Sequence, residues 1–291
     1  MLLLLLAASA PAEELRLLSY NTHGLPGWVA RDAPEQRLPA IAAELERYDL
    51  ALLQEDFAYH DRLLSQLRAT RVLRGNGRRS SCPICSGSGL TLVSTLPAGT
   101  LAEVTQQAYG RCAGWLGGAN DCLATKGFQL ARIELPSGAR LHLAHTHLDA
   151  GRSAADRAVR RQQLALLAEA IRARVGAGAL VVAGDLNLDA AQAEDAALLT
   201  DFLRALGLQD SGAHPPEGSH WKVLDYLLVR SGPDAQLSVH EAGEDTRFQL
   251  DGAPLSDHPA IFVKLAVEPV RSSRALSEWS RSPRPRESPR R

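Results

Sequence analysis

The chain has 291 residues, 45% of them hydrophobic, and a formal net charge of −1. This is enough apolar material for one large domain with a sizeable core, or for two small domains. The segment from Arg271 onward holds seven arginines and two glutamates, a charge of +5, which leaves −6 on the rest of the chain. A mildly acidic body argues against nonspecific binding of a polyanion through a broad basic face.

The N-terminal residues MLLLLLAASAPAEE combine an apolar run with the A-x-A pattern Ala8-Ser9-Ala10, which is typical of a secretory cleavage site. No basic residue precedes the leucines and the run is short, so a frayed apolar N-terminus is the alternative. A transmembrane helix needs about 20 apolar residues, more than this segment has. We interpret residues 1–12 as a signal segment and expect a secreted or periplasmic protein.

The four cysteines, Cys82, Cys85, Cys112 and Cys122, agree with export. Only one close C-x2-C pair is present, which argues against a four-cysteine zinc site. Two local disulfides, Cys82–Cys85 and Cys112–Cys122, are expected in an oxidising compartment. A reducible dithiol at the close pair is the alternative, but no thioredoxin-like pattern surrounds it.

Hydrophobic periodicity predicts alternating strands and helices with hairpins among them. Strands are expected at residues 15–20, 49–54, 89–94, 126–135, 139–147, 180–187, 221–230 and 259–267. Helices are expected at residues 35–47, 59–69, 153–174 and 191–206, with Ser153 as an N-cap and Gly207 as a stop. The pattern predicts an α/β or α+β domain over residues 13–268, followed by a disordered Arg/Ser/Pro-rich tail over residues 269–291.

Polar side chains stand where the predicted strands end. They are Asn21 in SYN, Glu55 in LLQED, His147 in THLDA, Asp185 and Asn187 in GDLN, and Asp257 and His258 in SDH. Functional groups placed at strand ends by a rigid sheet are a recurring site design. Asp185 and Asn187 lie two residues apart, so a continuous strand would point both side chains the same way.

The chemistry of these groups is coherent. Carboxylate and amide oxygens suit a hard cation such as Mg²⁺ or Ca²⁺, whereas the absence of clustered cysteines argues against zinc. Histidines beside such a site can bind a phosphate oxygen or move a proton. Together they supply what phosphoester hydrolysis needs: a metal to neutralise charge, a base for water, and donors for the transition state.

These motifs, with LDYLLV at Asp225, resemble in order those of the endonuclease/exonuclease/phosphatase superfamily, which has the DNase I-like fold. The resemblance covers residues 15–265. It implies an α/β (α+β) four-layer sandwich, two mixed β-sheets packed together with helices on both outer faces. Within the superfamily, DCLATKGFQLARI followed by THLDAG and GDLNLD is similar to the sphingomyelinase C branch.

The resemblance implies a role for each residue. The implied metal ligands are Asn21, Glu55 and Asp257, and the implied catalytic residues are His147, Asp185, Asn187, Asp225 and His258. His147 would bind phosphate, and Asp185 with Asn187 would position water and phosphate. Asp225 would orient His258, the general base or transition-state donor.

The resemblance also implies Mg²⁺, with Mn²⁺ or Ca²⁺ as alternatives, and a phosphodiester substrate. A phospholipid stands somewhat ahead of nucleic acid. A monomer with no stable protein partner and peripheral contact with a membrane is expected. One departure is the lack of an aromatic-rich hairpin: between Asp189 and Asp225 the only aromatic residues are Phe202 and Trp221.

Three points stay open at this stage. A secreted deoxyribonuclease on the same fold could use the arginines of the helix at residues 153–174, Arg157, Arg160 and Arg161. A non-catalytic phosphate-binding module is the other alternative. His220 and Trp221 lie near Asp225 in the sequence, where they could contact a headgroup.

Overall fold

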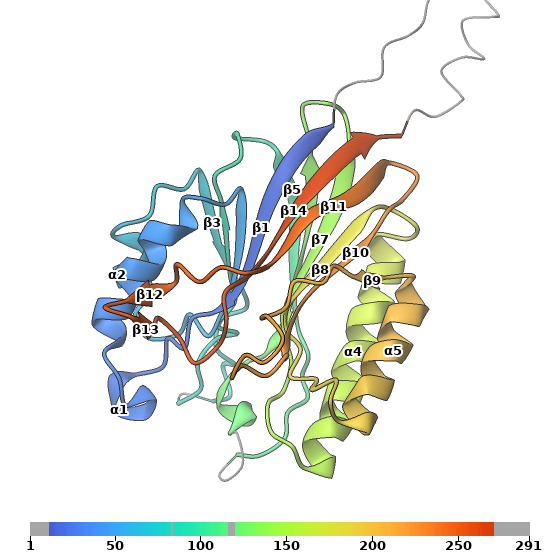
Figure 1. Cartoon of the computed structure of the whole chain (residues 1–291). Coiled ribbons are helices and arrows are strands. Elements are labelled where there is room, and N and C mark those ends of the chain that lie inside the picture. Colours follow the sequence, from blue (N-terminus) through green and yellow to red (C-terminus); the bar gives the residue numbers. More distant parts are fainter. Residues whose placement is uncertain (1–11, 83, 116–119, 271–291) are drawn as a thin grey trace, which may run out of the picture.

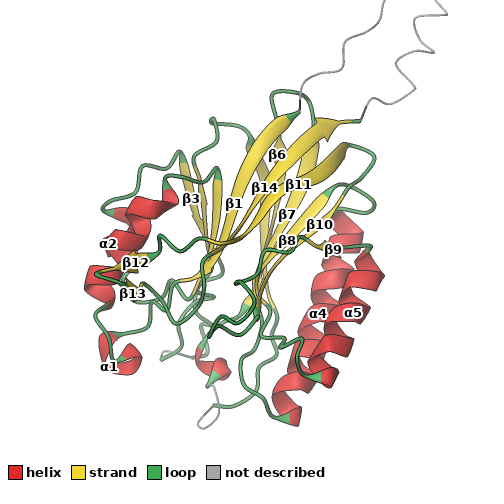
Figure 2. Cartoon of the chain, viewed as in Figure 1, coloured by secondary structure: helices red, strands yellow, loops and turns green. Residues whose placement is uncertain are grey.

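Two six-stranded sheets pack face to face, with helices on both outer faces (Figures 1 and 2). The structure is a computed structural model that describes residues 12–82, 84–115 and 120–270. The predicted four-layer α/β sandwich is confirmed. The predicted signal segment, residues 1–12, and the basic tail, residues 269–291, lie almost wholly outside the described residues.

The first sheet has the strand order β11-β14-β1-β2-β4-β3. Its strands are β1 (Glu13–Asn21), β2 (Leu50–Gln54), β3 (Arg71–Arg74), β4 (Thr91–Ser94), β11 (Ala235–Glu244) and β14 (Ile261–Pro269). On this side of the molecule lie α1 (Gly27–Ala30), α2 (Pro34–Leu45), α3 (His60–Leu64) and the small ribbon of β12 (Gln249–Leu250) and β13 (Ala253–Pro254) (Figure 1). β1 pairs parallel with β2 and antiparallel with β14.

The second sheet has the order β5-β6-β7-β8-β10-β9. Its strands are β5 (Leu101–Ala108), β6 (Gly127–Glu134), β7 (Arg140–His147), β8 (Leu180–Asp185), β9 (Gln209–Asp210) and β10 (Asp225–Arg230), and η1 (Asp121–Leu123) precedes β6. Helices α4 (Ala154–Arg174) and α5 (Ala193–Leu206) cover its outer face. As predicted, Ser153 is the N-cap of α4 and α5 stops at Gly207, which has the left-handed conformation. Ser153 also forms a capping box with Asp156.

The structure differs from the sequence prediction at the sheet edges. The helix expected at residues 59–69 ends at Leu64, and residues 71–74 join the first sheet as β3. β5 and β11 are absent from the prediction, since both are edge strands with exposed polar side chains that break the apolar pattern. The strand expected from residue 221 begins only at Asp225.

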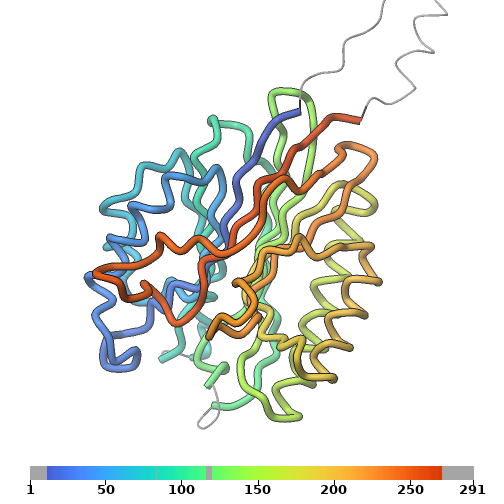
Figure 3. Tube along the Cα trace, viewed as in Figure 1, coloured from blue at the N-terminus to red at the C-terminus, as the bar shows by residue number. Residues whose placement is uncertain are grey.

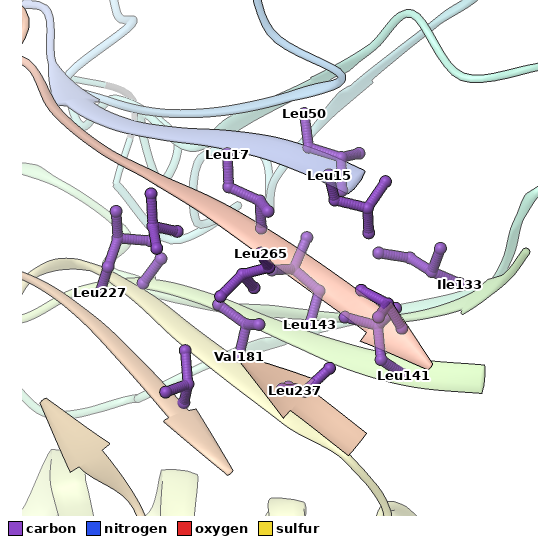
Figure 4. Packing of buried hydrophobic residues seen from close by; sticks show 14 of the residues in the cluster. Leu15, Leu17, Leu50, Ile133, Leu141, Leu143, Val181, Leu227, Leu237 and Leu265 are labelled. Carbon is purple, nitrogen blue, oxygen red and sulfur yellow. The ribbon is translucent and has the colours of Figure 1, made fainter. Parts of the chain in front are cut away.

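Three buried apolar clusters hold the layers together, one between the sheets and one under the helices on each outer face. Figure 4 shows the inter-sheet cluster, with Leu15 and Leu17 of β1 facing Leu143 and Val181 of the second sheet. Successive side chains of a strand point to opposite faces, so alternate residues enter different clusters. Burying apolar surface in this way is the main favourable contribution to folding.

The same alternation explains where the polar strand ends point. Ala183 of β8 lies in the inter-sheet cluster, and Asp185 follows it by two residues on the same face. β1 and β7 end in the same way, at Asn21 and His147. The layer between the sheets therefore changes from apolar to polar toward one end of the sandwich.

The described ends of the chain lie at the opposite end of the sandwich, side by side in Figure 3. Their position follows from the pairing of β1 with β14, which places Glu13 beside Val267. Within the described ranges, none of the helices is both long and apolar enough to cross a membrane.

Candidate active site

Strand register brings the predicted residues to one place. In the second sheet, His147 lies beside Asp185 across the parallel β7–β8 pair, and Asp225 lies beside Asp185 across the antiparallel β8–β10 pair. In the first sheet, Asn21 pairs with Gln54, so Glu55 follows directly. The loop before β14 adds two further groups, Asp257 and His258. The site is therefore shared between the two sheets.

His258 is held by two carboxylates. Its Nδ1 lies 2.8 Å from Oδ2 of Asp225, and its Nε2 lies 3.7 Å from Oδ2 of Asp185. Burial alone would lower the pKa of His258, but the negative charges of Asp225 and Asp185 outweigh burial and raise it to about 11. An Nδ1–H directed at Asp225 leaves Nε2 as the atom that faces the reaction space, as in a histidine–acid pair.

Asp185 is at the centre of the hydrogen-bond network. Its Oδ2 accepts a hydrogen bond of 3.2 Å from Nδ2 of Asn21 and lies 3.4 Å from Nε2 of His147. Only 1% of Asp185 is exposed, and this burial, together with the nearby charge of Asp225, raises its pKa to about 7. A nearby positive charge stabilises the ionised form of such a buried carboxylate.

Glu55 and Asp257 lie around a third histidine, His23. The Nδ1 atom of His23 is 3.1 Å from Oδ1 of Asp257 and 4.0 Å from Oε2 of Glu55. Its hydrogen bond to Asp257 outweighs burial and raises the pKa of His23. Asn21 donates a hydrogen bond of 3.2 Å to Oε1 of Glu55 and so connects Glu55 to Asp185. No role for His23 followed from the sequence.

Three site residues adopt the left-handed backbone conformation. His23, Glu55 and Asn187 have positive φ angles of 47°, 55° and 52°. A non-glycine residue in this conformation costs about 1–3 kcal/mol and persists only where the surrounding structure imposes it. Such residues cluster at functional sites, and three of them border one group of carboxylates here.

The site residues fit a hard cation. The amide nitrogen of Asn21 donates hydrogen bonds to both Glu55 and Asp185, which brings two carboxylates together, and oxygen ligands are what Mg²⁺ prefers. Ligand atoms of Asp185, Asp225 and His258 also lie within 4.8 Å of one another. We assign that second group to proton handling instead, because the contact between His258 and Asp225 already has hydrogen-bond length.

The prediction that a continuous strand aims Asp185 and Asn187 alike is wrong. β8 ends at Asp185, and the positive φ of Asn187 turns the chain away from strand geometry. The backbone N–H of Asn187 instead donates 2.9 Å to Oδ1 of Asp185, and its side-chain amide donates 3.1 Å to the carbonyl of Leu148. Asn187 therefore lies beside Asp185 through a turn.

Gly184, which precedes Asp185, lies against the backbone of β7 and leaves no room for a side chain. It has a φ of 144°, and a Cβ atom added there would lie 1.8 Å from the carbonyl oxygen of Thr146. We expect Gly184→Ala to lower the free energy of unfolding by at least about 2 kcal/mol, because the β7–β8 pair must move apart. Urea unfolding measures this effect. Gly77→Ala, where the added Cβ meets nothing within 4 Å, is the matched control and should change stability little.

The sequence reasoning missed Lys126. Its side chain is 5% exposed and lies 2.6 Å from Oδ1 of Asp121. Its Nζ also donates 2.6 Å to the carbonyl of Leu148 and lies 3.1 Å from Nε2 of His147. Burial, and then the charge of Lys126, hold the pKa of His147 well below its ordinary value. The available signal was a lysine inside DCLATKGF, directly before a buried strand.

We expect Lys126→Met to lower the free energy of unfolding by about 3–5 kcal/mol, because it leaves the buried carboxylate of Asp121 without its cation. The double variant Asp121→Asn/Lys126→Met should recover most of that stability. Both variants should lose about 10- to 100-fold in activity, since His147 loses the group that fixes its orientation. Urea unfolding and hydrolysis rates separate the two effects. A double variant with normal turnover would contradict a role for Lys126 in the site.

Both predicted disulfides, Cys82–Cys85 and Cys112–Cys122, are present. The second brings the loop after β5 against Asp121, the partner of Lys126. In the same loop, the backbone N–H of Ala113 donates a hydrogen bond of 2.6 Å to Oδ2 of Asp149. Asp149 is fully buried, so it fixes the loop beside the site.

A family model described as "Endonuclease/Exonuclease/phosphatase family" matches residues 18–258 of the chain. The chain belongs to the endonuclease/exonuclease/phosphatase family. This match spans every residue of the site described above, from Asn21 to His258. The resemblance inferred from the motifs is thereby confirmed.

Relatives within the family are described as sphingomyelinases. The chain is 28% identical over 267 residues to "Sphingomyelinase" of Mycobacterium bovis, covering 85% of this chain and 52% of the relative. It is 29% identical over 281 residues to "Putative neutral sphingomyelinase" of Drosophila melanogaster, covering 87% of this chain and 61% of the relative. The chain thus spans about half to three fifths of these relatives' lengths.

A solved structure shares the fold. A double mutant of the beta toxin from Staphylococcus aureus, crystallised with bound magnesium ions, superposes with a TM-score of 0.66 at 20% identity. The match covers 87% of this chain and 99% of the toxin chain. At this identity the likeness shows the fold of the family and no more.

Proposed function

We propose that this protein is a secreted, Mg²⁺-dependent phosphodiesterase that hydrolyses a phospholipid of the sphingomyelin type, with residues 13–268 as its catalytic domain. The observation that carries the proposal is the pair of His258 and Asp225 facing Asp185 within 3.7 Å. A proton-transfer group lies there beside oxygen ligands for a cation, in the arrangement that ester hydrolysis by water requires.

We assign the cation to Asn21, Glu55 and Asp257. Asn21 bonds to Glu55, and His23 lies close to both Glu55 and Asp257. When bound there, Mg²⁺ supplies positive charge that neutralises the phosphate oxygens and stabilises the transition state. Mn²⁺ and Ca²⁺ have the same preference for oxygen ligands and are the alternatives. Each of these three residues belongs to the first sheet or to a loop that adjoins it.

The remaining residues act on water and phosphate. His258, oriented by Asp225, removes a proton from the attacking water at Nε2 or donates one to the transition state. A cation held at Asn21, Glu55 and Asp257 would lower the pKa of His258 through its positive charge, and so favour the neutral imidazole that a general base needs. Asp185 and Asn187 position the water, and His147, fixed by Lys126, contacts the phosphate. Orientation of this kind lowers the entropic part of the barrier.

A lipid substrate is favoured over nucleic acid by the state of the arginines on α4. Arg160 is fully buried and bonds to Asp195 and to the carbonyls of residues 149–151. Arg157 forms an ion pair with Glu194. Of the three arginines Arg157, Arg160 and Arg161, only Arg161 is exposed, whereas phosphate binding along a DNA backbone needs several. The sphingomyelinase names of the relatives support the same choice.

Secretion and peripheral contact with a membrane belong to the same proposal. The two disulfides support an oxidising compartment. Trp28 on α1 is 84% exposed, and Ile84 and Trp115, in the loops that hold the disulfides, are 82% and 53% exposed. Large apolar side chains exposed to this degree suit contact with the interfacial region of a bilayer.

The test is a panel of substrates assayed with the purified chain and Mg²⁺: sphingomyelin in mixed micelles, phosphatidylcholine, plasmid DNA, and a phosphomonoester. We expect phosphocholine to be released from sphingomyelin. Plasmid DNA should not be nicked under the same conditions. Plasmid nicking without lipid hydrolysis would replace the proposal with a deoxyribonuclease. Binding of phosphate esters without any turnover would indicate a binding module.

A further inference from the structure

A cavity of about 180 Å³ opens beside His258. Its walls come from the loop before β10, the end of β11 and the segment before β14. The lining residues are His220, Trp221, Glu244, Asp245, Thr246, Phe248, Gln249, Gly252, Pro254, His258, Pro259 and Ala260. The site described above uses only His258 among them. Any group attached to a phosphate at His258 can therefore reach this cavity.

Two acidic side chains line the cavity, and the imidazole of His258, whose raised pKa makes it a cation, is already paired with Asp225. Glu244 and Asp245 are the acids in its lining, and the described residues that line it include neither lysine nor arginine. Asp245 is already neutralised, because Arg247 bonds to both of its oxygens. Glu244 accepts a hydrogen bond of 3.0 Å from the indole N–H of Trp221. The carboxylate of Glu244 thus remains as the negative charge that a ligand can approach.

Aromatic rings provide the second attraction for a cation. The rings of His220 and Trp221 lie 4.1 Å apart, and Phe248 also lines the cavity. A cation over the face of an aromatic ring is attracted by the ring's quadrupole, most strongly for tryptophan. Donation of the indole N–H to a carboxylate makes that face more electron-rich, because negative charge is placed at the ring edge. Trp221 and Glu244 therefore act on a cation together.

A larger cavity elsewhere on the described part of the chain has the opposite character. It measures about 410 Å³ and is lined by Arg74 and Arg78 together with the glycine-rich turn around Gly87. An arginine-lined wall repels an ammonium group, so the cavity at Trp221 is the better place for one. The cavity at Trp221 also has the smaller volume, which suits a compact group.

We propose that the cavity at Trp221 and Glu244 binds the cationic ammonium group of the substrate's headgroup while the phosphate lies at His258. The inference rests on the proposed phosphodiesterase function and deepens it, because it limits the substrate to phosphodiesters that carry a positive headgroup. Quaternary and primary ammonium groups share this chemistry. The experiment below separates the two.

Three chromogenic esters test the proposal on the full chain with Mg²⁺: p-nitrophenyl phosphorylcholine, its phosphorylethanolamine counterpart, and the uncharged ester in which carbon replaces the choline nitrogen. The choline and carbon esters have the same shape, so their ratio of kcat/KM isolates the positive charge. We expect the choline ester to be preferred by roughly 3- to 30-fold, the range of a cation over an aromatic ring. The ethanolamine ester shows whether the methyl groups matter.

Glu244→Gln should bring that ratio toward 1 while the carbon ester is hydrolysed near its original rate. Trp221→Ala should also bring the ratio toward 1, but it should slow both esters because an apolar wall is lost with the ring. Glu217→Gln removes an acid from the exposed part of the same loop, outside the cavity, and should leave the ratio unchanged. Because the ratio is measured within each variant, partial loss of folded protein cancels. A ratio near 1 in the unmodified protein, or one that both variants leave unaltered, would overturn the assignment.

Failure of the proposed function gives a different result, namely no hydrolysis of any of the three esters. Calorimetry then tests the cavity directly with phosphocholine and 3,3-dimethylbutyl phosphate, its uncharged counterpart. Tighter binding of phosphocholine, lost in Glu244→Gln, supports the cavity without any turnover. Equal affinity for the two compounds refutes it.

Discussion

Replacing His258 with alanine is expected to lower kcat/KM by about 10² to 10⁴-fold, the usual contribution of one catalytic proton-transfer group. The reason is its position: Nδ1 is fixed by Asp225 at 2.8 Å, which leaves Nε2 to face Asp185 and the attacking water. Hydrolysis of p-nitrophenyl phosphorylcholine at saturating Mg²⁺ measures the effect. Because the change also removes the charged partner of the buried Asp225, urea unfolding should establish that the variant is folded under the assay conditions.

Two further variants sharpen this result. Asp225→Asn keeps the shape of the acid but removes its charge, so it should also lose activity strongly, as orienting acids do in histidine–acid pairs. The double variant of His258 and Asp225 should be little worse than His258→Ala alone, because the two residues act as one unit. His240→Ala changes an exposed histidine of β11 and is the matched control. Near-normal activity in His258→Ala would remove it from the chemistry.

Removal of the metal is the second large effect. Activity should fall to background in excess EDTA and return on addition of Mg²⁺, because a bound cation contributes several kcal/mol to the stabilisation of phosphate charge. Glu55→Gln should lower activity at limiting Mg²⁺ by at least about 100-fold, since the amide loses the charge that binds the cation. Calorimetric titration with Mg²⁺ gives a readout that does not depend on turnover and should show weaker binding in this variant.

Glu169→Gln, on the exposed face of α4, makes the same chemical change away from the site and should bind Mg²⁺ like the unmodified protein. High Mg²⁺ should restore part of the activity of Glu55→Gln, because the defect lies in affinity. If EDTA leaves the rate unchanged, hydrolysis does not depend on a metal. If Glu55→Gln binds Mg²⁺ normally, the cation lies elsewhere in the site.

The strands that carry the site could be predicted because they are buried on both faces. β2 and β8 are apolar runs that end in polar residues, and β1 and β7 carry leucines at alternate positions that face the inter-sheet core. A buried strand ends in polar residues where the chain reaches solvent or a functional site. The edge strands β5 and β11 could not be predicted, since their exposed faces carry polar side chains that hide the alternation.

The contacts within the site depended on information that local patterns do not contain. The positive φ of Asn187 places it beside Asp185 by a turn, where strand periodicity predicted a shared face. Lys126 lies beside His147 because β6 pairs with β7 and because the ammonium group of Lys126 forms an ion pair with Asp121. The residue types at strand ends predicted the chemistry. Their mutual distances required the register between strands and the packing between sheets.

Because the site is divided between the two sheets, its geometry depends on how the sheets pack together. Asn21, Glu55 and His258 are attached to one sheet, and His147, Asp185 and Asp225 to the other, with apolar packing behind them. A relative shift of about 1 Å between catalytic groups can cost about 10²-fold in rate. The rate of hydrolysis should therefore depend strongly on the relative position of the two sheets. Heating or mild denaturant should therefore abolish the proposed activity while the circular dichroism spectrum is still that of the native protein. Substitutions of inter-sheet leucines remote from the site should also change the rate of hydrolysis.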